Sequence, residues 1–136
     1  LKNKDKKVSV FSKACPLFVP LVEEGFISGE LPLLLSNYYL CELKNTGIDT
    51  LILGCTHYPL LNKMINRVLG SSIKLVDSSL AISNLVKNKL EINNIISNNI
   101  DSEINCFVTD DAKNFKLVVN RFYKLNINSI NQINVF

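Results

Sequence analysis

The sequence has 136 residues, of which 47% are hydrophobic and 20% charged, and this length is typical of a single domain. The apolar content excludes a disordered chain, and no apolar run reaches the ~18 residues that a membrane-spanning helix needs. The net charge of +3 is a mild excess, and no aromatic residue interrupts the early lysine run, Lys2, Lys4, Lys6 and Lys7. We therefore predict a globular protein that binds neither nucleic acid nor a membrane.

Strand-like and helix-like segments alternate along the chain. In order, the predicted elements are a strand at 8–11, helices at 16–24 and 32–44, a strand at 50–54, a helix at 59–69, a strand at 73–76, a helix at 81–90, a strand at 104–108 and a helix at 111–124. Prolines open the first three helices, and Gly47 and Gly70 follow helix ends. Residues 93–102 are expected to form a polar loop and residues 125–136 a frayed low-complexity tail.

This alternation predicts an α/β fold in which layers of parallel sheet are flanked by helices. Ligands in such folds bind at the carboxyl ends of the strands. The rule selects four short segments as candidate site positions: 12–14, 55–57, 77–78 and 109–110.

The sequence contains four cysteines: Cys15, Cys41, Cys55 and Cys106. They form no C-x-x-C pair and follow no signal-peptide pattern, so we expect free thiols in a reducing cytoplasm. Cys41 within a helix and Cys106 within a strand are predicted to be core residues. Cys15, at a loop-to-helix junction before Pro16, could line a site.

Cys55 lies at a corner between a buried strand and the helix that Pro59 opens. The N–H groups of a helix start lower the pKa of a nearby thiol, and His57, the single histidine, can exchange a proton with it. The alternative interpretation is a buried cysteine that acts as a small hydrophobic residue. Zinc would need two further ligands, and a phosphatase-type cysteine would need an arginine nearer than Arg67, so we predict no metal and no phosphatase loop.

Residues 51–61, LILGCTHYPLL, resemble the second catalytic motif of the glutamate racemase family. The segment 14–25, ACPLFVPLVEEG, resembles the family's preceding segment and is the more specific match, because the cysteine motif also occurs in the wider aspartate/glutamate racemases. Residues 76–78 and 107–111 match in the expected order, so the resemblance covers residues 8–124.

The resemblance implies two pseudo-symmetric α/β halves with the active site between them, and no pyridoxal phosphate, other cofactor or metal. It implies that Cys55 is one of two thiols that flank the substrate Cα, one removing and the other donating a proton. It further implies that Thr56 and His57 contact substrate, that His57 tunes Cys55, and that Glu24 is an acidic residue near the catalytic pair, with a solvated helix end as its alternative. Glutamate is the implied substrate, and the complete enzyme is expected to be a homodimer.

The family's first cysteine, in a Cys-Asn-Thr-like motif, and its early Asp-Ser segment are missing, and the chain begins at Leu1. We therefore expect a C-terminal portion: residues 1–80 as a second α/β domain, 81–124 returning to a missing first domain, and 125–136 as the tail. Such a portion should not racemise glutamate alone, and it should expose Phe115, Val118 and Phe122. The alternatives are an aspartate racemase, a non-catalytic carboxylate-binding module and a cysteine-nucleophile hydrolase.

Overall fold

The computed structural model describes residues 7–98, 103–123 and 125–135, and the early lysines Lys2, Lys4 and Lys6 lie outside them. The chain forms two compact units, Leu1–Val86 and Lys87–Phe136. The boundary between the units lies within a helix, α4 (Ser78–Ile92), several residues beyond the predicted division at 80/81.

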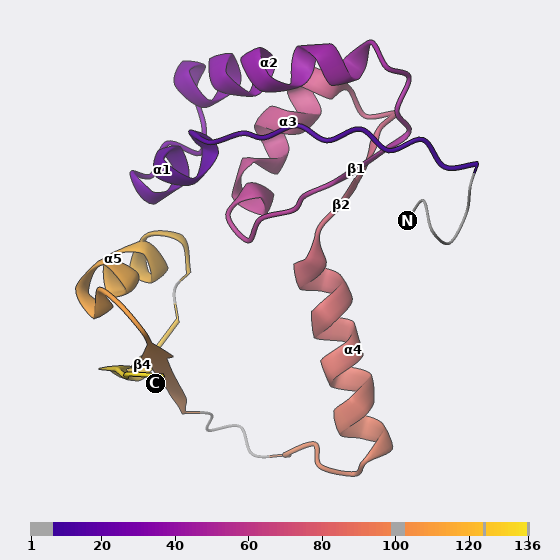
Figure 1. Cartoon of the computed structure of the whole chain (residues 1–136). Helices are drawn as coiled ribbons and strands as arrows, with labels where there is room; N and C mark the ends of the chain where they lie inside the picture. Colours follow the sequence, from indigo (N-terminus) through magenta and orange to yellow (C-terminus); the bar gives the residue numbers. More distant parts are fainter. Residues whose placement is uncertain (1–6, 99–102, 124, 136) are drawn as a thin grey trace. The chain divides into compact units, whose positions relative to one another are not determined.

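Among its described residues, the first unit has two strands and four helical segments before α4 (Figure 1). They are α1 (Phe18–Glu23), α2 (Glu30–Lys44), β1 (Thr50–Ile52), the 3-10 helix η1 (Tyr58–Leu61), α3 (Asn62–Leu69) and β2 (Lys74–Val76). Strands β1 and β2 pair in parallel, with Thr50 opposite Lys74 and Ile52 opposite Val76. The predicted α/β fold with parallel strands and flanking helices is confirmed.

The core of the first unit is formed by the helices. Phe18 of α1 and Leu61 of η1 are 1% and 0% exposed, and Val22 and Ile65 are as deeply buried. The rings of Tyr39 and Tyr58 contact Phe18 edge-on, with centroids 5.3 and 5.4 Å away. These contacts fix α1, α2 and η1 against one another.

Cys41 is exposed, and the prediction that it is a core residue was wrong. The buried stripe of α2 contains Pro32, Ser36, Tyr39, Leu40 and Leu43. Consecutive helix positions point about 100° apart, so Cys41 falls outside the stripe although Leu40 lies in it. Cys106, also predicted to be buried, is half-buried in its strand.

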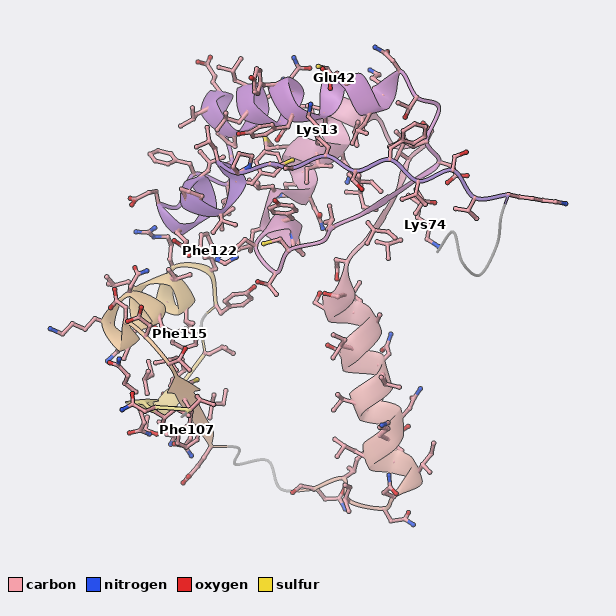
Figure 2. The ribbon with its side chains drawn as sticks, in the orientation of Figure 1. Lys13, Glu42, Lys74, Phe107, Phe115 and Phe122 are labelled. Carbon is pink, nitrogen blue, oxygen red and sulfur yellow. The ribbon has the colours of Figure 1, made fainter. Side chains whose placement is uncertain are left out.

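The predicted strand at 8–11 is not formed by the described residues. The segment runs extended alongside the unit but has no strand partner there (Figure 1). Its β-branched pattern satisfies the propensity for a strand, yet a strand also needs a hydrogen-bonded neighbour. Lys13 at its end forms a 2.7 Å ion pair with Glu42 of α2, and the two side chains lie close together in Figure 2.

The second unit contains β3 (Ile104–Val108), α5 (Ala112–Phe122) and β4 (Ile127–Gln132), with β3 and β4 in parallel. Residues 127–132 of the predicted frayed tail form β4, which pairs along β3, so the prediction was wrong for this part. Phe115, Val118 and Phe122 are half-buried rather than exposed, since α5 packs against β4. Figure 2 labels two of these side chains and Phe107 of β3, which is exposed.

Within the described residues, no helix has both the length and the apolar content to cross a membrane.

Candidate active site

Cys55 lies in the turn that joins β1 to η1. The strand pairing ends with the Leu53 N–H, which donates to the Val76 carbonyl at 2.8 Å. The Tyr58 N–H then donates to the Cys55 carbonyl at 3.2 Å, which closes the turn. The helix predicted from Pro59 thus begins as a 3-10 turn and becomes α-helical at Asn62. Cys55 is half-buried, so its thiol is held at the corner and still reaches solvent.

His57 connects the thiol to a carboxylate. Its Nδ1 lies 3.8 Å from Cys55 Sγ, and its Nε2 lies 3.4 Å from Glu23 Oε1. A carboxylate beside Nε2 favours the tautomer with its proton there, which leaves Nδ1 to accept from the Cys55 S–H. The Thr56 hydroxyl, 3.5 Å from the same Nδ1, is exposed.

This row of groups is suited to proton transfer at sulfur. The imidazole can take the thiol proton through Nδ1, and the Glu23 carboxylate stabilises the imidazolium that forms. An imidazolium beside Cys55 in turn stabilises the thiolate. The geometry therefore places one ring nitrogen of His57 beside the Cys55 thiol and the other beside the Glu23 carboxylate.

Sequence and structure comparisons identify relatives of this chain. No family model matches it. It is 48% identical over 121 residues to the glutamate racemase of Sulfurihydrogenibium sp. (strain YO3AOP1), covering 88% of this chain and 44% of that protein. It is 37% identical over 136 residues to the glutamate racemase of Geobacter metallireducens, covering 99% and 50%.

Solved glutamate racemases have the same fold. The crystal structure of the enzyme from Francisella tularensis in complex with D-glutamate matches 98% of this chain and 50% of that chain, at a TM-score of 0.84 and 32% identity. An isoform from Bacillus anthracis matches 99% and 50%, at a TM-score of 0.84 and 28% identity. This chain is therefore similar to part of the known glutamate racemases over nearly all of its own length. It spans about half the length of the family members that it matches.

Within this racemase fold, the acidic residue at His57 is Glu23 and not the predicted Glu24. Glu23 ends α1, which packs against η1, whereas Glu24 is exposed at the helix C-cap. No contact joins Glu24 to Cys55 or His57 in the described part of the chain. Spacing and charge are nearly the same for two adjacent glutamates, so only the packing of α1 distinguishes them.

Cys15, the thiol of the matching segment 14–25, is buried and lies next to Tyr58 of η1. Its carbonyl accepts a 3.3 Å hydrogen bond from the Tyr58 hydroxyl. Burial raises the pKa of the Cys15 thiol, which the nearby Lys13 offsets in part, and burial likewise raises the pKa of Tyr58. A buried thiol with a raised pKa is poorly suited to act as a base, so Cys55 is the better candidate.

Three of the four predicted strand-end segments lie in the first unit. The Cys15–Tyr58 bond brings the end of the N-terminal segment to η1, and β2 ends beside β1. Asp77 follows β2 and accepts from the Ser79 and Leu80 N–H groups, and a hydrogen bond from the Ser79 hydroxyl lowers its pKa. The fourth segment, 109–110, belongs to the second unit. The described residues contain no cluster of three His, Cys, Asp or Glu side chains that could hold a metal.

Proposed function

We propose that this chain is the C-terminal portion of a cofactor-independent glutamate racemase and carries one of its two catalytic thiols. The observation that carries the proposal is the row Glu23–His57–Cys55, with 3.4 Å and 3.8 Å between the neighbouring groups. The similarity to glutamate racemases supports glutamate as the substrate, because one similar protein has been solved in complex with D-glutamate. The enzyme would interconvert L- and D-glutamate and supply D-glutamate for peptidoglycan in the cytoplasm.

In the proposed reaction, the Cys55 thiolate removes the α-proton from one face of the substrate. The electron pair left at Cα is delocalised into the substrate carboxylate, and a second thiol outside this chain donates a proton to the opposite face. In the reverse direction, Cys55 donates and the other thiol accepts. We expect Thr56 to contact the substrate, and this is supported by its exposed hydroxyl, which lies 3.5 Å from His57 Nδ1.

His57 and Glu23 act on Cys55 rather than on the reacting carbon. The imidazole holds the thiol proton when Cys55 is needed as a thiolate and returns it when Cys55 is needed as an acid. Glu23 fixes the orientation of the ring and stabilises its charged form. We therefore assign Glu23 as a positioning residue.

The decisive experiment replaces Cys55 with serine in the complete racemase. A hydroxyl is a far weaker acid than a thiol, so we expect kcat to fall by about 10²–10⁴-fold, the usual contribution of a general acid–base group. Exchange of the substrate α-proton with deuterium should fall in parallel, and this readout also excludes a hydrolase or a carboxylate-binding module. The matched control is Cys41→Ser, which changes an exposed thiol on α2 and should leave kcat unchanged. Turnover retained by Cys55→Ser would refute the assignment.

The chain by itself is expected not to racemise glutamate. Proton removal and delivery on opposite faces of Cα require two acid–base groups, and Cys15 is buried. Circular dichroism should first establish that the isolated chain is folded. Racemisation by the folded chain alone would contradict the two-thiol mechanism.

Glu23 and its neighbour Glu24 allow a matched test of the positioning role that we assign to Glu23. Glu23→Gln should lower kcat roughly tenfold or more, because it removes the charge that lies 3.4 Å from His57 Nε2, and it should shift the pH profile of kcat. Glu24→Gln removes the same charge one residue away and should leave both unchanged. An equal response of the two variants would show that the Glu23–His57 contact does not act in the reaction.

A further inference from the structure

Tyr58 follows His57 directly and connects the turn that carries Cys55 to the start of α1. Its backbone N–H donates to the Cys55 carbonyl at 3.2 Å, and its side-chain hydroxyl donates to the Cys15 carbonyl at 3.3 Å. The same Cys15 carbonyl accepts at 3.1 Å from the N–H of Phe18, the first residue of α1. One residue therefore holds the turn through its backbone and the start of the helix through its side chain.

The ring of Tyr58 adds a second contact to the same helix. Phe18 is 1% exposed, and the rings of Tyr39 and Tyr58 meet it edge-on. The Tyr39 hydroxyl accepts from the Leu17 N–H at 3.4 Å, so α2 contacts the start of α1 as well. Burial raises the pKa of Tyr58, so its hydroxyl keeps the proton that it donates near neutral pH. The start of α1 is thus fixed by ring packing and by two tyrosine hydroxyls.

The other end of α1 carries Glu23, whose carboxylate lies 3.4 Å from His57 Nε2. The helix has six residues, so at about 1.5 Å per residue its two ends are less than about 10 Å apart. Its backbone hydrogen bonds make it move as one piece, and a displacement of its start is passed on to its end. A separation of 3.4 Å is close to the limit of a hydrogen bond, so a small displacement of α1 breaks the contact of Glu23 with His57.

We propose that Tyr58 is a positioning residue, whose hydroxyl holds the start of α1 so that Glu23 at its end reaches His57. Two neighbouring residues attach the helix, since His57 contacts its end and Tyr58 its start. Two such points fix the orientation of a short helix, whereas one point leaves it free to pivot. Tyr58 acts on Cys55 only through Glu23 and His57. This inference rests on the proposed function, which gives the contact between Glu23 and His57 its role.

The first test measures that contact itself, in this chain and without turnover. His57 is the single histidine, so its ring protons are identified directly by NMR. In the wild-type chain we expect a nuclear Overhauser effect between these protons and the side-chain protons of Glu23. Tyr58→Phe keeps the ring and leaves the Cys15 carbonyl bonded to the Phe18 N–H, so the fold should be retained. The effect between Glu23 and His57 should be lost.

Two controls separate positioning from a loss of stability. The nuclear Overhauser effect between the rings of Phe18 and Tyr39 should persist in the Tyr58→Phe chain, because neither ring is changed. Tyr38→Phe removes an exposed hydroxyl from α2 and should leave the contact of His57 unchanged. A contact of His57 that survives Tyr58→Phe would overturn the proposal. Loss of the contact between Phe18 and Tyr39 would overturn it too, because Tyr58 would then hold the core as a whole.

The second test measures kcat and KM in the complete racemase. Tyr58→Phe should lower kcat by about three- to tenfold, the range for one hydrogen bond, and leave KM nearly unchanged, because no substrate-binding group is altered. Adding Tyr58→Phe to Glu23→Gln should cause no further loss, because both changes remove the same contact. A further loss of kcat in the double variant would mean that Tyr58 acts by another route, contrary to the proposal.

The two tests distinguish failure of this inference from failure of the proposed function. If Glu23→Gln lowers kcat and Tyr58→Phe does not, the positioning role of Tyr58 is refuted and the proposed function stands. If Tyr58→Phe removes the contact of His57 and Glu23→Gln leaves kcat unchanged, the hold of Tyr58 on α1 is supported. In that case the proposed role of Glu23 in the reaction is refuted.

Discussion

Helices α1, α2 and α3 are stabilised in a different way from helices α4 and α5. Helices α1, α2 and α3 have no side-chain hydrogen bond at the N-cap, yet together they contain most of the buried residues. The N-termini of α4 and α5 are capped by Asp77 and Asp111, and neither helix contains a buried residue. The difference indicates that a helix with a packed stripe does not need a cap, whereas a helix without one depends on local contacts.

The magnitudes explain this division. Burying a large apolar side chain contributes about 1.5–3 kcal/mol, and a good N-cap contributes about 1 kcal/mol. The stripe of α2 therefore outweighs any cap, although its N-cap is Gly29 at a φ of 100°. On α5 the two-stranded sheet covers Phe115 and Phe122 only in part, so the Asp111 cap is a large share of what stabilises the helix.

The largest expected effect comes from deleting a ring in the packed unit. Phe18→Ala should lower the free energy of unfolding of the first unit by about 3–5 kcal/mol, because it leaves a cavity among the rings of Tyr39 and Tyr58. The matched change Phe115→Ala should cost about 1 kcal/mol in the second unit, because that ring is only half-buried. Urea unfolding followed by amide exchange in α3 and α5 measures both.

If Phe18→Ala does not fold, Phe18→Leu provides the same comparison with a smaller loss. Equal costs for the two phenylalanine deletions would contradict the contrast between a packed unit and an uncovered one.

A smaller effect is expected at the cap of α5. The Asp111 side chain accepts from the Asn114 N–H at 2.9 Å while its backbone has a φ of +31°. Asp111→Ala should cost about 1 kcal/mol and accelerate amide exchange across the first turn, whereas Asp111→Gly removes the cap and relieves the backbone, so it should cost less. Exchange in α3 is the internal control. An Asp111→Ala variant with unchanged exchange in α5 would mean that packing on β4 alone holds this helix.

Periodicity and end signals predicted most of the elements. The strand at 104–108 was predicted with the bounds that β3 has, and the helix predicted at 59–69 corresponds to η1 and α3, which end before Gly70. The strand predictions that failed depended on whether a segment has a pairing strand elsewhere in the chain, which a local sequence pattern does not reveal. Residues 8–11 have a high strand propensity, but no neighbouring strand pairs with them among the described residues. Residues 127–132 have a low-complexity sequence, but they pair with β3 and form a strand.

The candidate site shows the same difference between local and long-range contacts. The spacing of Cys55 and His57 in one turn is local, and the sequence indicated that pair directly. The partner of His57 on its other side comes from α1, more than thirty residues earlier, so the choice of Glu23 over Glu24 required the packing of α1 against η1. Local chemistry was therefore predictable, and the long-range contact that orients it was not.

The smallest expected effect concerns the ion pair that attaches the N-terminal segment to α2. The Lys13 hydrogen bond lowers the pKa of Glu42, and Glu42 raises the pKa of Lys13. The lowered carboxyl pKa contributes stability above the unfolded value near 4.3, lost as pH falls through the folded pKa. The raised lysine pKa contributes stability below the unfolded value near 10.4, lost as pH rises through the folded pKa. Glu42→Gln should therefore lower the Tm of the first unit slightly at pH 7 and low salt, with the difference vanishing at pH 3 or in 1 M salt, because the pair is exposed. A difference that persists at pH 3 would mean that Glu42 acts through packing and not through charge.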